Sequence, residues 1–235
     1  MPKRKRSTTK VTTVTKTRGR KRRARRRSRI PQAFPDRFVS KMKYVDFITL
    51  DMGATDSGIP KTYNFRANSI FDPDKSGVGH QPLGHDEMNV VYDHYCVIGS
   101  KIKCTFAPQG GQVVNVDMLY MLQVADTPPS HGNAIDFLEQ NNTKGTTIAP
   151  GYAGGAKTLT AHYSPYKLFG LSKKDSLISN NKLNTSFGSN PTEDAIFQVG
   201  VVCPTATSAN PAPIRVRVEI EYLVVCTERR PLNRS

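Results

Sequence analysis

Apolar and polar residues alternate along several segments of this chain, a pattern typical of β-strands that bury one face. In the clearest segment, Ile214 to Cys226, every even position is apolar or Tyr, whereas the odd positions begin with two Arg and two Glu. The same period of two predicts strands over residues 95–106, 112–125 and 197–203, and more weakly over 39–50, 62–70 and 157–169. One face of these strands is therefore expected to lie in a core and the other in solvent or at an interface.

Long connections rich in Gly, Pro, Ser and Asn separate these segments, at residues 72–84, 126–155, 171–192 and 204–213. A helical period is weak and is confined to residues 86–92 and 133–140. Seven or eight strands with so little helix exclude a fold of alternating strands and helices. The pattern predicts an all-β fold, a single antiparallel jelly roll, which is an eight-stranded β-sandwich with long loops.

The positive charge of the chain is concentrated at its N-terminus, where Met1 to Arg29 holds 15 Lys and Arg and no Asp or Glu. The rest has 34 − 15 = 19 basic residues against 19 acidic ones, so it is formally neutral. Residues 1–30 are expected to form a disordered arm, because like charges repel and nothing there can be buried, and residues 31–235 to form the jelly-roll domain. Such an arm binds polyanions strongly, with little dependence on sequence and a steep dependence on salt.

Nuclear import is an alternative role for the arm, since Lys3-Arg4-Lys5-Arg6 and the cluster from Arg20 to Arg27 both resemble import signals. Fifteen charges exceed what such a signal needs, and one arm can serve import and nucleic-acid binding together. Attachment to a membrane surface is disfavoured, because the arm has no apolar face and no lipidation motif.

A second group of cations lies in the predicted strands. In a jelly roll the first, third and last strands are neighbours in one sheet. Their odd-numbered cations should therefore lie on the same side of that sheet. We call this set the basic face: Lys41, Lys43, Lys101, Lys103, Arg215 and Arg217. Glu219 and Glu221 partly offset this charge, and ordinary solvated or cross-strand-paired charge is the alternative reading. The residues predicted to bind nucleic acid are Lys3, Arg4, Lys5, Arg6, Arg18, Arg20, Lys21, Arg22, Arg23, Arg25, Arg26, Arg27, Arg29, Lys101, Lys103, Arg215 and Arg217.

Signals for catalysis or cofactor binding are poor, because the sequence has no phosphate-binding, zinc-protease, nucleophile-elbow or dinucleotide motif. His80, His85, Asp86 and His94 lie near one another in sequence, but loop packing explains their spacing better than a metal does. The segment 72–77 resembles the start of a calcium loop, yet the twelfth position, where an EF-hand needs Glu, is Leu83. We therefore predict no enzyme activity, no cofactor and no metal, with a looser ion site between subunits left open.

Four cysteines, Cys96, Cys104, Cys203 and Cys226, each fall within an apolar run and form no CxxC pair. Buried free thiols in a reducing compartment are expected.

Residues 68–88 contain N-S-I-F-D-P-D and G-H-Q-P, and residues 92–106 contain Y-D-H-Y-C-V and K-I-K. With these motifs, the two segments resemble the capsid proteins of circovirus-like circular single-stranded DNA viruses. The closing I-R-V-R-V strand, followed by a short polar tail, is similar too. This resemblance implies a single jelly roll in a small icosahedral shell, an inward arm on packaged DNA, and entry of the protein into the host nucleus.

The predicted function is a viral capsid protein without a catalytic step, found in the virion and in the host nucleus. Its partners would be the single-stranded DNA genome (RNA in recombinant particles), about sixty copies of itself, the nuclear-import machinery and a host receptor that the sequence does not identify. Fifteen charges on each of about sixty arms give roughly 900 positive charges, the scale of a small single-stranded genome. The alternative is a cellular nucleic-acid-binding protein with a basic tail, of ribosomal or chromatin type.

Overall fold

The computed structural model describes residues 34–53, 58–109, 116–149, 156–172, 176–204 and 211–231. The chain divides into two units, Met1–Ala33 and Phe34–Ser235. The first unit lies outside the described residues, and with it the predicted disordered arm.

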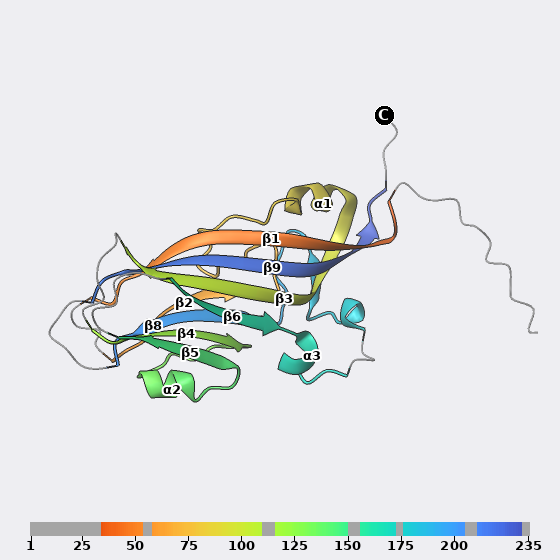
Figure 1. Cartoon of the computed structure of the whole chain (residues 1–235). Coiled ribbons are helices and arrows are strands. Elements are labelled where there is room, and N and C mark those ends of the chain that lie inside the picture. The colour runs from red at the N-terminus through yellow and green to blue at the C-terminus, as the bar shows by residue number, and fades with distance from the viewer. Residues whose placement is uncertain are drawn as a thin grey trace, which may run out of the picture. The chain divides into compact units, whose positions relative to one another are not determined.

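Two antiparallel sheets pack face to face in the second unit (Figure 1). Sheet 1 has the order β1 (Arg37–Leu50), β9 (Ile214–Arg229), β3 (Tyr92–Pro108) and β6 (Lys157–Tyr163), and the short β7 (Asn184–Ser186) also pairs with β3. Sheet 2 has the order β2 (Lys61–Arg66), β8 (Ile196–Val202), β4 (Met118–Ala125) and β5 (Thr143–Ile148). Early and late strands thus alternate across each sheet, which is the jelly-roll order, and the predicted fold is confirmed.

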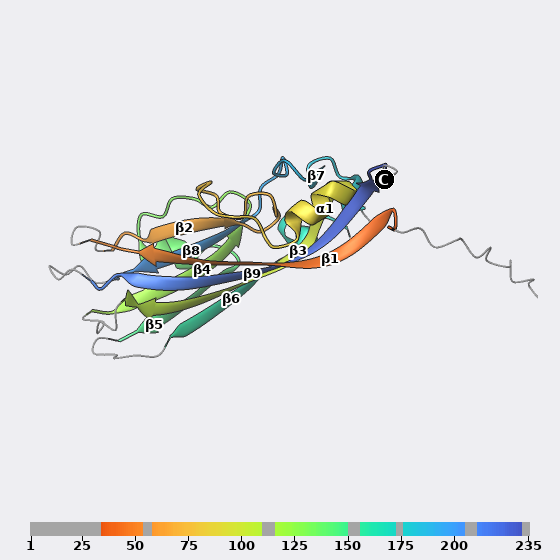
Figure 2. The same ribbon diagram turned by 90° about the horizontal axis from the view of Figure 1, so that it is seen from above.

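The core lies between the two sheets, where the even positions of β9 meet apolar side chains of sheet 2. On β3 the core positions are odd at Tyr95 and Val97 and even from Ile102 onward, because the register shifts between Val97 and Gly99. Cys96 and Ile98 therefore point to the other side, into a small cluster with Leu177 and Leu183. The stacked rings of Phe106 on β3 and Tyr120 on β4, with centroids 4.7 Å apart, join the layers. Figure 2, a view turned by 90° from that of Figure 1, shows the long strands β1, β9 and β3 side by side. The alternation in sequence therefore marks a core face and a solvent face for sheet 1.

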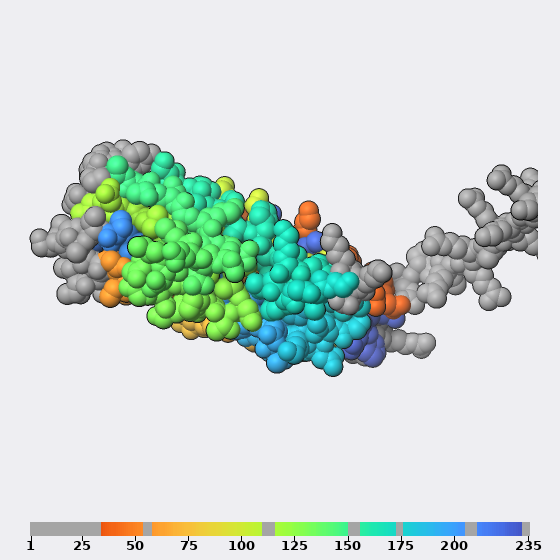
Figure 3. All heavy atoms as spheres, turned by 90° about the horizontal axis from the view of Figure 1, so that it is seen from below, coloured from red at the N-terminus to blue at the C-terminus, as the bar shows by residue number. Residues whose placement is uncertain are grey.

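The helices are short: α1 (His85–Val91), α2 (Ala134–Leu138), α3 (Pro165–Leu168) and the 3₁₀ turn η2 (Leu177–Ser179). Asn133 caps α2 by accepting a hydrogen bond from the backbone N–H of Asp136 at 2.9 Å. The ring of buried Phe137 packs over Gly200 of β8, where an added Cβ would approach it to 3.2 Å. Figure 3 shows the molecule from the side on which α2 lies. Side chains of the green segment that contains α2 and β5 cover the outer face of sheet 2 in this view. Sheet 2 is therefore buried on both faces over β4 and β8, so the expectation of one solvent face was wrong for these two strands, because the segment that contains α2 packs over them.

Some predicted boundaries were wrong. The strand expected over 157–169 ends at Tyr163, because Pro165 opens α3, and the strand expected over 62–70 ends at Arg66. β5 lies inside the predicted loop 126–155 and β7 inside the predicted loop 171–192. Of the strand expected over 112–125, residues 112–115 lie outside the described residues and β4 begins at Met118.

All four cysteines are buried and free, as predicted. Burial raises the pKa of the Cys96 thiol to about 12 and that of Cys226 to about 11, which keeps both thiols protonated and poorly reactive. Among the described residues no helix is long and apolar enough to cross a membrane.

Candidate nucleic-acid interface

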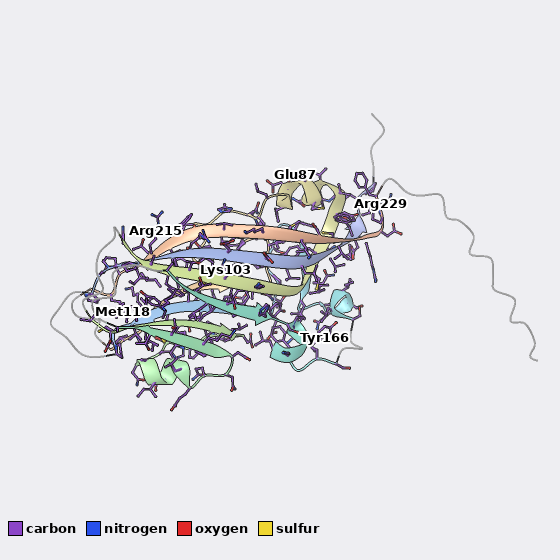
Figure 4. The ribbon with its side chains drawn as sticks, in the orientation of Figure 1. Glu87, Lys103, Met118, Tyr166, Arg215 and Arg229 are labelled. Carbon is purple, nitrogen blue, oxygen red and sulfur yellow. The ribbon has the colours of Figure 1, made fainter. Side chains whose placement is uncertain are left out.

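The six cations of the basic face do share the solvent face of sheet 1. β9 runs between β1 and β3, so Glu221 lies opposite both Lys43 and Lys101, and Glu219 lies opposite Lys103. All six are exposed, and Arg215 and Lys103 are labelled on the neighbouring strands β9 and β3 in Figure 4. The jelly-roll order therefore gathers charges from three distant segments of the sequence.

Glu219 neutralises part of this face. It accepts a hydrogen bond from the Lys43 Nζ at 2.6 Å, and its other oxygen lies 2.9 Å from the Arg217 guanidinium. The hydrogen bond and charge of Lys43, aided by Arg217 and Lys103, lower the pKa of Glu219 below the usual range of a glutamate, so it stays ionised. Lys43 and Arg217 are thus partly paired, as the alternative reading from the sequence allowed.

The remaining lysines of the basic face are available for a ligand. Lys41, Lys101 and Lys103 form no ion pair with any other described residue. Lys41 and Lys101 line a surface hollow of about 280 Å³ together with Ser100, His162 and Glu221. With six cations against two carboxylates, the basic face carries a formal charge of +4 on a body that is neutral overall.

Phe47 lies on the same face and was not singled out by the sequence analysis. It occupies an odd position on β1, as do Lys41 and Lys43, and it is 55% exposed. The Arg215 guanidinium lies 4.9 Å from the centroid of its ring, a cation–π contact. The available signal was a large apolar residue at a position where the alternation of β1 calls for a polar one.

The predicted arm residues, from Lys3 to Arg29, lie outside the described residues. Their role in binding nucleic acid stays a prediction.

The segment that resembles a calcium loop forms a hydrogen-bonded turn. Asp74, which is 1% exposed, accepts hydrogen bonds from the Tyr63 hydroxyl at 2.8 Å and from the backbone N–H of Ser76 at 2.9 Å. Arg66 donates to the Asp72 carboxylate at 2.7 Å and bridges to Asp194 at 3.5 Å. The Asp74 carboxylate thus caps the turn at Ser76, and the Asp72 carboxylate is paired with Arg66.

The histidines near this turn are held by separate partners. The ring nitrogens of His80 lie 2.9 Å from the Gln81 carbonyl oxygen and 3.0 Å from the Val45 carbonyl oxygen. His85 contacts Asp86 and the Phe187 carbonyl oxygen at 3.0 and 3.1 Å, and His94 lies 3.0 Å from Glu228. No group of three His, Cys, Asp or Glu side chains within the described part of the chain is arranged to hold a metal.

No protein-family model matches the chain, and no curated protein matches it in sequence. Among solved structures, it is similar to Desmodium yellow mottle tymovirus (9% identity, 100% of both chains, TM-score 0.41). It is also similar to a 60-mer of the BFDV capsid protein (10% identity, 86% of this chain and 100% of that one, TM-score 0.46). A third similarity is to a semi-empty virus-like particle of Macrobrachium rosenbergii nodavirus, from the giant freshwater prawn (7% identity, 87% of this chain and 100% of that one, TM-score 0.47). With every TM-score below 0.5, these similarities carry no functional conclusion for this chain.

Proposed function

We propose that this protein is a viral capsid protein that assembles into a small icosahedral shell and packages single-stranded DNA. The most direct support is that one chain combines a jelly-roll domain with an N-terminal segment that has fifteen Lys and Arg residues and no Asp or Glu. Jelly rolls are common shell-forming domains, although the fold alone does not decide function. The sequence motifs in 68–88 and 92–106 that resemble circovirus-like capsid proteins point the same way.

The proposed division of labour follows from the charge distribution. The arm neutralises phosphates through counterion release, which needs no base recognition, and the basic face adds a positive surface on the folded body. The neutral remainder of the body can pack against further copies without strong repulsion between like charges. The clusters in the arm would also direct the protein to the nucleus.

A cellular nucleic-acid-binding protein is the second candidate, and one observation favours it. Such domains carry cations and exposed aromatic rings on their folded surface, and the basic face with Phe47 has both. The two candidates share nucleic-acid binding and differ in self-assembly.

Negative-stain microscopy of the purified full-length protein separates them. A capsid protein yields uniform closed particles, whereas a binding module yields monomers or small oligomers. A second variant lacks residues 1–29. We expect circular dichroism to show that the remaining domain is folded, and we expect its particles to have lost most of their nucleic acid. Unchanged absorbance of nucleic acid in that variant would contradict the role of the arm.

A further inference from the structure

An aromatic ring surrounded by cations is exposed at one end of the basic face. Phe47 lies opposite Arg217 on β9, and the Arg215 guanidinium stacks against the ring at 4.9 Å. More than half of the side chain, 55%, remains open to solvent. An exposed ring of this size on a charged strand face offers a flat apolar surface that no described residue covers completely.

Further cations lie beside the ring. Arg217 is opposite Thr105 on β3, and the next outward position on that strand is Lys103, which forms no ion pair with a described residue. On the same strand as Phe47, Val45 is 37% exposed and extends the apolar surface by one position. The arrangement is an apolar platform with positive charge on its flanks.

A second feature lies farther along the same face. The hollow lined by Lys41, Lys101, His162 and Glu221 lies six residues from Phe47 along β1, about 20 Å at 3.3 Å per residue. A chain of phosphates that begins at the ring and follows β9 and β3 would pass Lys103 and reach the two lysines of this hollow. The cations are therefore spaced for an extended polyanion.

Unpaired nucleobases match this chemistry. Single-stranded nucleic acid stacks its bases on aromatic rings or on Arg guanidinium planes, while neighbouring Lys and Arg hold the phosphates. A duplex keeps the faces of its bases inside the helix and can offer only phosphates. A second copy of the same face is disfavoured as the occupant, because it would bring six more cations against these six.

We propose that the basic face binds single-stranded nucleic acid, with one unpaired base stacked on the Phe47–Arg215 pair and the adjoining phosphates on Lys103 and the hollow at Lys41 and Lys101. This inference deepens the proposed function and depends on it for the source of the strand.

The test measures binding of full-length protein to two fluorescent probes, oligo-deoxythymidine and an abasic strand of equal length, at raised salt. Salt weakens the phosphate contacts of the arm, so stacking contributes a larger share of the affinity. For Phe47→Leu we expect about tenfold weaker binding of oligo-deoxythymidine, the change that corresponds to about 1.4 kcal/mol for one stacked base. Binding of the abasic strand should not change, and Phe47→Trp should match the wild type or exceed it.

Val39→Ala is the matched control, because it changes an exposed apolar residue at an odd position of the same strand, eight residues from Phe47, and removes no ring; its binding should equal that of the wild type. Equal binding of oligo-deoxythymidine by Phe47→Leu and wild type would overturn the inference. Loss of particles by Phe47→Leu with normal binding would also overturn it, and would assign the ring to a contact between copies.

Photocrosslinking provides an independent measurement. An oligonucleotide that carries 5-iodouracil should crosslink to the β1 peptide that contains Phe47, whereas crosslinks confined to other peptides would count against the stack. If the wild type forms no particles, the capsid proposal fails, yet the comparison of the two probes can still be read on unassembled protein.

Discussion

The two sheets of this sandwich differ in what covers their outer faces. On sheet 2, β4 and β8 are buried at nearly every position, because the segment that contains α2 packs over them. On sheet 1, β9 alternates between buried and exposed positions, and the exposed ones are charged. One outer face is covered, and the charged positions of the other are exposed to solvent. The difference teaches that a strand with charged residues on its second face leaves that face exposed, whereas a strand with apolar residues on both faces, such as β4, is covered on both sides.

The largest effect is expected from a charge on the covered face. Met121 is fully buried on sheet 2 near Gly200 and Phe137. Met121→Glu would bury an unpaired carboxylate, which costs several kcal/mol against a total stability of about 5–15 kcal/mol, so we expect insoluble protein. The measurement is the soluble fraction after expression.

Thr49→Glu is the control, since it places the same carboxylate at an exposed position on β1, opposite Arg215. It should remain soluble. A soluble, folded Met121→Glu protein would show that α2 does not seal sheet 2.

A smaller effect is expected on the open face, where charges can be removed without unfolding. The double variant Lys101→Ala/Lys103→Ala should bind single-stranded DNA more weakly for every sequence. Its plot of log affinity against log salt should be shallower by about 1.4, which is about 0.7 for each lost phosphate contact. Filter binding over a series of salt concentrations measures this slope.

Lys61→Ala is the matched control, because Lys61 is an exposed cation on β2 of sheet 2, outside the basic face. A loss of slope of about 0.7 for Lys61→Ala, the same for each removed charge, would mean that the basic face has no special part in binding.

The edge of sheet 1 should respond to pH more modestly. Both ring nitrogens of His80 face carbonyl oxygens, which only accept hydrogen bonds, so both contacts are satisfied only when the ring is protonated. The Gln81 and Val45 carbonyls and the charge of Asp46 raise the pKa of His80 above its usual value. Its stabilising contribution is therefore complete below the unfolded pKa of about 6.5 and is lost as pH rises through the higher folded value.

Urea unfolding across this pH range tests the effect. The advantage of wild type over His80→Gln should shrink as pH rises above about 6.5. A constant difference between the two proteins at all pH values would rule out a contribution from the protonated ring.

The sequence predicted the long strands, including β4 and β8, but it did not predict that these two would be buried on both faces. β9 and β3 stood out because their buried and exposed residues alternate, and the jelly roll followed from their number and from the long loops. β5 was missed because its sequence, T-K-G-T-T-I, has only one apolar residue, and its place in the sheet comes from pairing with β4. Local pattern does not report such tertiary support.

The site was predictable in part for the same reason. The six cations all occupy odd positions of their strands, which was enough to predict that they share a face. The contact of Arg215 with Phe47 depends in addition on the register between β1 and β9, two strands at opposite ends of the sequence. Likewise, the pairing of Glu219 with both Lys43 and Arg217 arises only after that register is set. The two-residue period of the sequence shows which residues share a face of the sheet. The pairing register of the strands then decides which of those residues are in contact.

The central claim is that an open, basic sheet face and a basic arm serve a protein that encloses nucleic acid in a shell of its own copies. Light scattering coupled to size-exclusion chromatography of the full-length protein, with absorbance at the nucleic-acid and protein wavelengths, tests it most directly. We predict a single particle whose protein mass is about sixty times 26.0 kDa, or roughly 1.6 MDa, and which contains nucleic acid. A monomer or small oligomer under conditions where the protein is folded and bound to nucleic acid would contradict it.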